Sequence, residues 1–424
     1  MTAIPPTKNI LFISYDGMTD SLGQSQVLPY VIGLAQSKHY HMTLLSCEKH
    51  HNFEKYNKEI KDLCTANGID WHYTFFHQSP PIASKYYDMF LLRRKAISLI
   101  KRKQIDALHC RGHVPMFFST KIKKKFNLKL IFDFRGYWVD ERVDAGLWDL
   151  RYFPYRFAFQ YYKRREANFI RESESIVVLT NRAKQDILSW PTYDGKRPID
   201  VIPCVADFNH FSLVTEEKRS HAKAILQIPD HSFTLSYLGS VGTWYLLKEM
   251  LLFYKALLRK NSDVYFLFLT HSNPNIITTQ CNLLGIDYSR IIIRYASRNE
   301  IPILAAASNC SISFIKPSYS KIGSSPTKLG ELFAMGIPVI CNSNVGDVEN
   351  IVESMKGGLV LDALDEQSFH QAIEQIEFIS SLGGKKLRDN ADQYYNLQNG
   401  IEKYCTLYSR LFRANSLITS QGLK

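Results

Sequence analysis

The sequence predicts two doubly wound α/β domains that follow one another along the chain. Short apolar runs, each typical of a buried parallel strand, alternate with amphipathic helical patterns. This alternation is the pattern of α/β folds with parallel sheets. The alternation of strands and helices begins anew after Pro203. In addition, 424 residues are too many for one ordinary hydrophobic core. We therefore expect the domain boundary within residues 203–211.

The first half opens with a strand, a glycine-containing loop and a helix. Residues 9–14 form a short apolar run, and a helical pattern continues from Gln24 or Ser25 to about Ala35. A second apolar run completes a β-loop-α-β unit, the opening of a doubly wound domain. Strands of the same kind are expected at residues 41–47, 106–110, 128–134, 175–180 and 199–205.

The second half repeats this architecture. A strand at residues 233–240 contains Gly239 at its end and is followed by an amphipathic helix over residues 246–260. The last helical pattern, residues 396–412, could pack on either domain. Further strands are expected at residues 264–270, 291–297, 310–315, 337–343 and 358–362. The expected division of the chain is 1–204, 205–390 and a C-terminal helical segment 391–424.

Composition and charge narrow the functional classes. With 45% hydrophobic and 22% charged residues the chain has the composition of a folded globular protein, and no run of about 18 apolar residues predicts a membrane span. Residues 1–14 lack a signal-peptide pattern, and the eight cysteines are scattered without a C-x-x-C pair, so we expect a reduced, cytoplasmic protein. The net charge of +12 favours an acidic partner such as phosphate groups, an anionic membrane surface or nucleic acid.

A short helix is expected over residues 326–335, preceded by a polar cluster. Ser325 is a good N-cap, and Pro326 suits the first helical position because its missing N–H costs nothing there. Gly336 and Pro338 end the helix.

The start of this helix is suited to an anion. The free N–H groups of Thr327 and Lys328 can bind an anion, which the helix dipole also stabilises. The side chain of Lys328 adds a full positive charge. Glu331 lies about 6 Å along the axis from Thr327, an offset that suits a diphosphate at the helix start and ribose hydroxyls at the carboxylate. Ser324 and Ser325 belong to the same candidate site. The alternative is a well-capped core helix with Glu331 on a solvated face.

Two glycines follow the first strand of the second half. Gly239 ends the strand and Gly242 lies in the turn, with Ser240 between them, and glycines there let the backbone approach a phosphate closely. The sequence matches neither a P-loop nor G-x-G-x-x-G. The alternative is an ordinary tight turn between strand and helix.

Polar residues also follow strands of the first half, where α/β sheets bind their ligands. Each of them alone is equally consistent with a structural role. The candidates are Asp16, Gly23, Arg111, His113 and Arg135.

Several other chemistries lack support in the sequence. We find no G-x-S-x-G elbow, no H-E-x-x-H helix, no clustered Cys/His set and no D-x-D pair after a strand. Neither a metal ion nor another cofactor is therefore expected.

Taken together, these features resemble a GT-B glycosyltransferase of the retaining family 4, over essentially the whole chain. Residues 331–340 (ELFAMGIPVI) are similar to the family's E-A-M-A-x-G-x-P-V-I donor motif, and residues 345–351 (VGDVENI) to its G-G-x-x-E-I segment. Residues 201–211 (VIPCVADFNHF) resemble the interdomain segment V-I-P-N-G-V-D-x-x-x-F. The resemblance implies two Rossmann-like domains facing across a cleft, with a nucleotide sugar bound by the second and its ribose bound by Glu331.

The chain departs from the family pattern at several positions. Gly323 stands where the first glutamate of E-x7-E is expected, and Ser240 and Tyr245 stand at the two basic positions of the diphosphate site. A subgroup with G-x-x-G after the strand and P-S/T-K-x-x-E before the helix is more similar. In that subgroup the lysine supplies the positive charge, which implies this role for Lys328. Arg135 stands where a histidine is common in the family.

The resemblance implies a hexosyltransferase-type, metal-independent enzyme. It would move a sugar from a nucleotide-diphosphate sugar, expected to be a UDP-sugar, to a saccharide or lipid-linked acceptor in surface polysaccharide or glycolipid synthesis. Lys328, Glu331 and Arg135 would be catalytic, and Thr327 and Gly239 would help to bind the donor. Two alternatives stay open: a UDP-sugar 2-epimerase of the same architecture, and a non-catalytic nucleotide-sugar binding protein.

Two basic stretches predict contact with a membrane. Residues 86–104 form a basic amphipathic helix, residues 151–165 mix aromatic side chains with arginine and lysine, and residues 121–125 add positive charge. Such a mixture suits an anionic bilayer, so peripheral attachment to the cytosolic membrane face is our hypothesis. The alternative is a core helix with a solvated basic face. Nucleic acid is not an expected partner, because no recognised module accompanies the charge.

Overall fold

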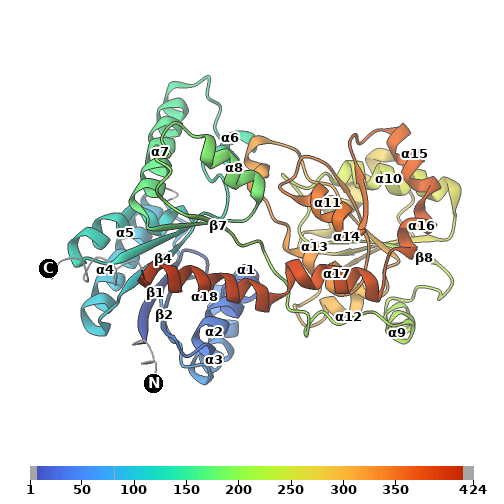
Figure 1. Cartoon of the computed structure of the whole chain (residues 1–424). Coiled ribbons are helices and arrows are strands. Elements are labelled where there is room, and N and C mark those ends of the chain that lie inside the picture. The colour runs from blue at the N-terminus through green and yellow to red at the C-terminus, as the bar shows by residue number, and fades with distance from the viewer. Residues whose placement is uncertain (1–6, 81, 414–424) are drawn as a thin grey trace. The chain divides into compact units, whose positions relative to one another are not determined.

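The computed structural model describes residues 7–80 and 82–413, which form two compact units (Figure 1). One unit contains the chain up to Pro203 together with the segment from Leu397 onward, and the other is Cys204–Asn396. Each unit has a parallel β-sheet with helices packed against it (Figure 1). The prediction of two doubly wound α/β domains is therefore confirmed.

The first unit is built on a seven-stranded sheet in the order β3-β2-β1-β4-β5-β6-β7. The order reverses between β1 and β4, which is where open α/β sheets bind ligands. The strands are β1 Lys8–Ser14, β2 Tyr40–Glu48, β3 Asp70–Phe75, β4 Ala107–Arg111, β5 Lys129–Asp133, β6 Ser175–Val178 and β7 Ile199–Val201. The helices are α1 Ser21–Gln26, α2 Leu28–Gln36, α3 His50–Ala66, α4 Ala83–Lys103, α5 His113–Phe126, α6 Asp140–Asp144, α7 Phe153–Glu172, α8 Asn181–Ser189 and α18 Leu397–Arg413.

The second unit has a six-stranded sheet in the order β10-β9-β8-β11-β12-β13. The order reverses between β8 and β11, so the turn after β8 lies at the switch point. The strands are β8 Phe233–Leu238, β9 Val264–Leu269, β10 Ile291–Arg294, β11 Cys310–Ser313, β12 Val339–Asn342 and β13 Gly358–Leu361. The helices are α9 Glu216–Leu226, α10 Leu247–Lys260, α11 Pro274–Leu284, α12 Ile301–Ala305, the 3-10 turn η1 Tyr319–Gly323, α13 Thr327–Ala334, α14 Val348–Met355, α15 Glu366–Glu374, α16 Ile376–Ser381 and α17 Lys385–Tyr395.

Strand β3 is absent from the expected strands. Its sequence, DWHYTF, contains no continuous apolar run, and its residues are only partly buried because the strand lies at the edge of the sheet. Period-2 and apolar-run criteria detect the central strands more readily, because those strands are covered on both faces.

The C-terminal segment is divided between the two units. Helix α17 packs with α13 in the second unit, whereas α18 packs on α2 in the first. Tyr404 of α18 lies edge-on against Tyr30 of α2 at 5.2 Å, and a Cβ on Gly33 would lie 2.1 Å from Ile401, so these two helices approach closely. The expected separate segment 391–424 thus contains the end of one unit and a returning helix of the other; its residues from 414 on lie outside the described chain.

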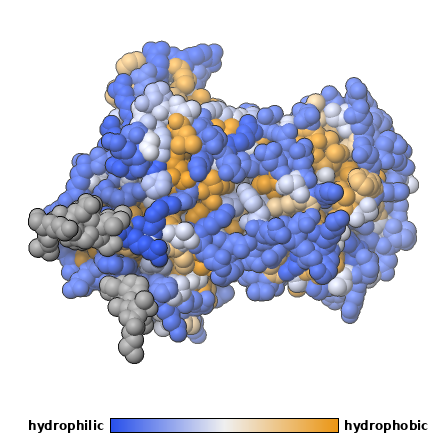
Figure 2. Space-filling view, in the orientation of Figure 1, coloured by the Kyte–Doolittle hydropathy of each residue, from blue (hydrophilic) through white to orange (hydrophobic). Residues whose placement is uncertain are grey.

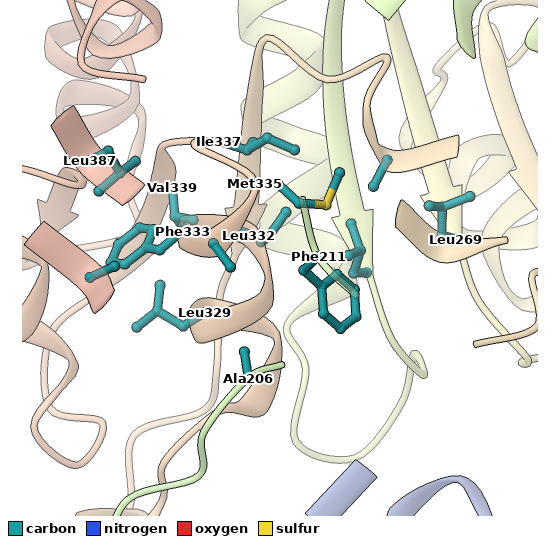
Figure 3. Close-up of a cluster of buried hydrophobic side chains, with 14 of the residues drawn as sticks. Ala206, Phe211, Leu269, Leu329, Leu332, Phe333, Met335, Ile337, Val339 and Leu387 are labelled. Carbon is teal, nitrogen blue, oxygen red and sulfur yellow. The ribbon is translucent and has the colours of Figure 1, made fainter. Parts of the chain in front are cut away.

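Helix α13 is fixed in the second unit by its apolar face. Leu329, Leu332 and Phe333 are buried in one cluster with Val339 and Leu387 (Figure 3). Because α-helical residues three and four apart share a face, Lys328 and Glu331 lie together on the remaining, polar face.

Within residues 7–80 and 82–413, the helices are either too short or too polar to cross a lipid bilayer. All eight cysteines of the chain are present as free thiols, seven of them buried.

Candidate functional site

Helix α13 starts without a side-chain cap. It extends over Thr327–Ala334, one residue shorter at each end than expected, and Pro326 occupies the N-cap position. The prediction that Ser325 caps the helix is wrong: its Oγ instead accepts a hydrogen bond from the Cys204 N–H at 3.2 Å. The hydroxyl of Ser325 is used to hold the start of the second unit in place.

The first turn of α13 offers hydrogen-bond donors. In the part of the chain that the structure describes, the N–H groups of Thr327 and Lys328 have no acceptor, and the first amide to find one is that of Leu329, which donates to the Pro326 carbonyl at 3.1 Å. These two N–H groups lie at the positive end of the helix dipole. They can therefore bind an anionic oxygen.

The ammonium group of Lys328 lies between two tyrosine rings. Its Nζ is 4.3 Å from the ring centre of Tyr237 and 3.9 Å from that of Tyr245, and it donates to the Tyr237 hydroxyl at 3.3 Å. Removal of the ammonium from water lowers the pKa of Lys328 to about 7, although the charge of Glu331 acts in the opposite direction. Lys328 thus carries only part of its charge at neutral pH, and a bound anion would restore the rest.

Tyr237 connects Lys328 to the turn after β8. Its hydroxyl accepts from Lys328 and donates to the Ser240 carbonyl at 2.6 Å. Burial raises the pKa of Tyr237 above its usual value, so the phenol stays neutral and acts as a donor. Neither tyrosine was predicted from the sequence to contact Lys328, although both flank the glycine turn in the chain.

The turn after β8 is exposed and requires glycine. Gly239 and Gly242 have φ angles of +119° and +130°, which side-chain-bearing residues rarely adopt. A Cβ on Gly239 would lie 3.5 Å from Lys328 Nζ, so this turn and the lysine border the same space. The N–H of Gly239 donates to the Leu269 carbonyl at 2.9 Å, whereas those of Ser240 and Gly242 have no acceptor among the described residues.

Glu331 follows Lys328 by almost one helical turn. Its carboxylate is mostly buried, and Oε1 lies 3.9 Å from Nη1 of Arg298. Burial raises the pKa of Glu331, while the charges of Arg298 and Lys328 oppose this rise. Arg298 is a component that the sequence did not reveal, because it lies far from α13 in the chain and in no motif.

The cluster around Lys328 combines amide donors, one cation and one carboxylate. Such a set can neutralise a diphosphate and accept hydrogen bonds from hydroxyl groups. Ser324 and Ser325 precede α13 as expected, and the Ser324 N–H donates to the Lys321 carbonyl at 3.0 Å. No group of three or more His, Cys, Asp or Glu side chains among residues 7–80 and 82–413 is arranged to hold a metal ion.

A second polar cluster lies at the carboxyl ends of β1, β4 and β5. Arg111 Nε is 3.4 Å from Asp16 Oδ2, and Arg111 Nη1 is 3.8 Å from Asp133 Oδ2. Arg135 Nη1 is 3.5 Å from Asp133 Oδ1. The structure thus brings three of the candidates of the first half together, with Asp16 the most exposed of them.

Asp133 joins these groups although it is fully buried. Burial opposes its ionisation, but Arg135, His109 and Arg111 outweigh burial and hold its pKa well below the usual range. The hydroxyl of Tyr404, on the returning helix α18, donates to Asp133 Oδ2 at 3.3 Å. Asp133 therefore stays negative and orients the two arginines.

His113 and Gly23 are placed in structural surroundings. His113 Nε2 lies 2.7 Å from the buried Glu166, so the histidine joins α5 to α7. A Cβ on Gly23 would lie 2.1 Å from the Gly17 carbonyl, so this glycine permits close packing of the loop after β1. Their roles in acceptor binding stay predictions.

Glu48, at the end of β2, shapes the loop after β1. Its buried carboxylate accepts from the N–H of Met18 at 2.7 Å and from that of Thr19 at 3.0 Å. Glu48 is not among the residues predicted from the sequence, although its position directly after the apolar run 41–47 was a signal for it.

Residues 31–210 match the family model described as Glycosyltransferase Family 4. None of the curated proteins with which the chain was compared matches it in sequence.

Solved structures resemble the chain over almost its full length. Sucrose-phosphate synthase from Thermosynechococcus elongatus is 14% identical with a TM-score of 0.69, covering 96% of this chain and 100% of that one. HepE from Anabaena in complex with UDP and glucose is 14% identical with a TM-score of 0.67, covering 94% and 99%. The lipopolysaccharide outer core galactosyltransferase WaaB is 13% identical with a TM-score of 0.61, covering 95% and 99%. At these identities the likeness establishes a shared fold.

Proposed function

We propose that the protein is a retaining, hexosyltransferase-type glycosyltransferase. The proposal starts from the GT-B fold of the chain and from the family 4 match over residues 31–210. The donor is a nucleoside-diphosphate sugar of the UDP type. The acceptor is a saccharide or a lipid-linked saccharide, in the synthesis of a surface polysaccharide or glycolipid. HepE, solved with UDP and glucose, and the galactosyltransferase WaaB support this choice of donor and pathway.

The observation that carries the proposal is the placement of Lys328. Its ammonium borders Gly239, and its own N–H group, in the first turn of α13, has no acceptor among the described residues. When a nucleoside diphosphate leaves the sugar, negative charge develops on the diphosphate. Fixed hydrogen-bond donors and a partly desolvated cation stabilise such a charge strongly. A lysine whose pKa is lowered to about 7 gains from an anion that restores its charge.

Glu331 is proposed to accept hydrogen bonds from the ribose hydroxyls. Arg298, 3.9 Å away, favours the ionised carboxylate and limits its orientation. The ionised form is the better acceptor, because it offers both oxygens to donors.

In the first unit, the cluster of Asp16, Arg111 and Arg135 is proposed to serve the acceptor. Asp16 is 43% exposed and held by Arg111, so it can accept hydrogen bonds from sugar hydroxyls. Arg135 is fixed by Asp133 and supplies positive charge, a catalytic role that we propose from its place after β5. Gly23, which permits close packing of the loop after β1, and His113, which joins α5 to α7, are proposed to belong to the same acceptor site.

The reaction is proposed to need no metal ion or other cofactor. Lys328 and the amide donors of α13 supply the positive charge that a divalent cation would otherwise bring to the diphosphate. Addition of a chelator should therefore leave turnover unchanged.

The protein is proposed to be cytoplasmic and to act at the cytosolic face of a membrane, where a lipid-linked acceptor would be available. The basic and aromatic stretches of the first unit support this location.

The test is incubation of the purified protein with a panel of UDP-sugars, with and without saccharide acceptors, followed by mass spectrometry of the products. Transfer with retained anomeric configuration is the expected result. Formation of an epimerised UDP-sugar would identify an epimerase instead, and donor binding without any product would identify a non-catalytic binding protein. The Lys328→Met variant is run in parallel and should form much less product.

A further inference from the structure

Large apolar side chains are exposed in two stretches of the first unit. In the described part of the chain, residues 82–90 and 147–161 hold ten of the 22 exposed large apolar side chains. Phe153 is 68% exposed and Phe157 62% exposed, values unusual for phenylalanine. We call the ten residues the aromatic patch: Ile82, Tyr86, Tyr87, Phe90, Leu147, Tyr152, Phe153, Tyr155, Phe157 and Tyr161.

The exposed Tyr86 and the partly buried Tyr162 connect the two stretches. Burial and, after it, the neighbouring hydroxyl of Tyr86 at the start of α4 raise the pKa of Tyr162 on α7, so these two side chains lie next to each other. Trp148 stacks on the same Tyr162 at 5.9 Å between ring centres, and Arg142 lies 3.8 Å from the ring centre of Trp138. Figure 2 shows a few hydrophobic residues among hydrophilic ones at the end of the first unit that Figure 1 marks with α7. Tyr86 of the first stretch and Trp148 of the second therefore both lie against Tyr162.

Both helices change from aromatic to basic along their exposed faces. On α4, Phe90 is followed three and four residues later by the exposed Arg93 and Arg94. On α7, Phe157 and Tyr161 are followed on the same face by the exposed Arg164. Residues three and four apart lie on one face of a helix, so each face presents aromatic rings and then guanidinium groups.

The surroundings of the aromatic patch are positive. Residues 82–104 contain seven lysines and arginines and one acidic residue, Asp88. Asp88 is fully buried, where it accepts from the Tyr15 hydroxyl at 3.0 Å, so it does not reduce the charge at the surface. Residues 151–165 contain five lysines and arginines and no acidic residue. Arg151 and Lys163 are paired with carboxylates, but a positive excess remains on Arg156, Arg164 and Arg165.

We infer that the aromatic patch inserts into the headgroup region of an anionic phospholipid bilayer, with Arg93, Arg94 and Arg164 bound to lipid phosphates. Aromatic side chains favour the membrane–water interface, and arginine forms bidentate contacts with phosphate. The charge of the surface matches anionic lipid, and a soluble protein rarely leaves so many aromatic rings in water. The inference rests on the proposed function only in that a lipid-linked acceptor would be reached at this surface.

The test is flotation of the full-length protein with two kinds of vesicle, phosphatidylcholine alone and phosphatidylcholine mixed with phosphatidylglycerol. We expect binding to the anionic vesicles and its loss at high salt, because exposed charges are screened. The double change Arg93→Gln and Arg94→Gln should weaken binding roughly 25-fold, at about fivefold for each basic residue near the surface. Phe153→Ser combined with Phe157→Ser should weaken binding by roughly tenfold or more, because buried apolar area is lost.

Matched controls come from the second unit. Phe378→Ser removes an aromatic ring that is 61% exposed on α16, and Lys385→Gln with Lys386→Gln removes two exposed charges on α17. These variants should bind vesicles like the unaltered protein. Equal loss of binding in controls and patch variants would overturn the inference, because it would show attraction by net charge alone.

Two other outcomes would also overturn the inference. No binding of the unaltered protein to anionic vesicles at low salt would exclude a lipid surface. Conversion of an oligomer to a monomer by Phe153→Ser and Phe157→Ser, seen by sedimentation velocity, would assign the aromatic patch to contacts between copies of the chain. Binding of UDP by the same variants tests the proposed function separately. Vesicle binding without any UDP binding would refute the proposed function but not the assignment of the aromatic patch to membrane binding.

Discussion

Lys328 shows how a single residue acquires its chemistry from its neighbours. Two tyrosine rings and the start of α13 take its ammonium largely out of water, and this lowers its pKa to about 7. An anion bound beside the ammonium would favour its charged form and raise the pKa again. The lysine is therefore suited to a charge that appears during the reaction.

We expect Lys328→Met to lower turnover by about 10²-fold or more, the scale for losing one fixed stabiliser of developing charge. Steady-state kinetics with the best UDP-sugar measures this effect. Lys248→Met, at an exposed position on α10 of the same unit, is the control and should keep full activity. Unaltered kinetics of Lys328→Met would remove the lysine from the mechanism.

The affinity for a UDP-sugar should depend on pH through Lys328. Below a pH of about 7 the lysine is charged before binding, so affinity stays constant. Above that value the free protein has lost the proton that the complex retains, so binding takes up a proton and affinity falls by about tenfold per pH unit. Calorimetry in buffers of different ionisation enthalpy should show an uptake that approaches one proton. Zero uptake at alkaline pH would contradict this account, and Lys328→Met should abolish it.

Glu331→Gln should mainly weaken donor binding, by roughly tenfold, since it removes an acceptor of charged hydrogen bonds. Isothermal calorimetry with UDP measures the change. Glu353→Gln alters an exposed glutamate on α14 of the same unit and should leave the affinity unaltered. An equal effect of both changes, or of neither, would speak against contact between Glu331 and the ribose.

At the scale of elements, the turn after β8 and the start of α13 form one site because both border Lys328 Nζ. Gly239→Ala should cost about 1–3 kcal/mol of stability, because φ is +119° there, and should also weaken donor binding, because the added methyl group lies beside the lysine. Urea unfolding and UDP titration measure the two effects.

Gly285→Ala provides the comparison. This glycine also has a positive φ, +60°, but it ends α11 and lies beside Lys255 rather than Lys328. Its replacement should reduce stability without altering the affinity for UDP. If Gly239→Ala behaves in the same way, the turn does not border the bound donor.

The elements themselves were largely predictable. Apolar runs identify the central strands, since these strands are covered on both faces, and the bounds of α13 differ from the expected ones by one residue at each end. The edge strand β3 was not predicted, because a half-exposed strand does not require a continuous apolar run. The wrong N-cap has a tertiary cause: Ser325 is recruited by the backbone of Cys204, which is distant in sequence.

At the scale of the whole molecule, each unit has its own sheet and its own buried core. The residues that we assign to the donor all lie in Cys204–Asn396. UDP should therefore raise the melting temperature of that unit, with a stabilisation of about 2.7 kcal/mol when UDP is at 100 times its Kd. Hydrogen exchange followed by mass spectrometry locates the effect. Equal protection by UDP in β1 and β8 would show that the donor also binds the first unit.

The sequence by itself determined the two α/β domains, their approximate boundary, the helix that contains Lys328 and Glu331, and the glycine turn before it. These features are local: strand runs, helix ends and glycine positions are set by neighbouring residues. Only the tertiary structure decided that Tyr237 and Tyr245 enclose Lys328, that Arg298 reaches Glu331 and that Tyr404 of α18 returns to Asp133. The pKa of a buried group depends on which distant side chains surround it, and burial is a property of the folded chain rather than of any segment.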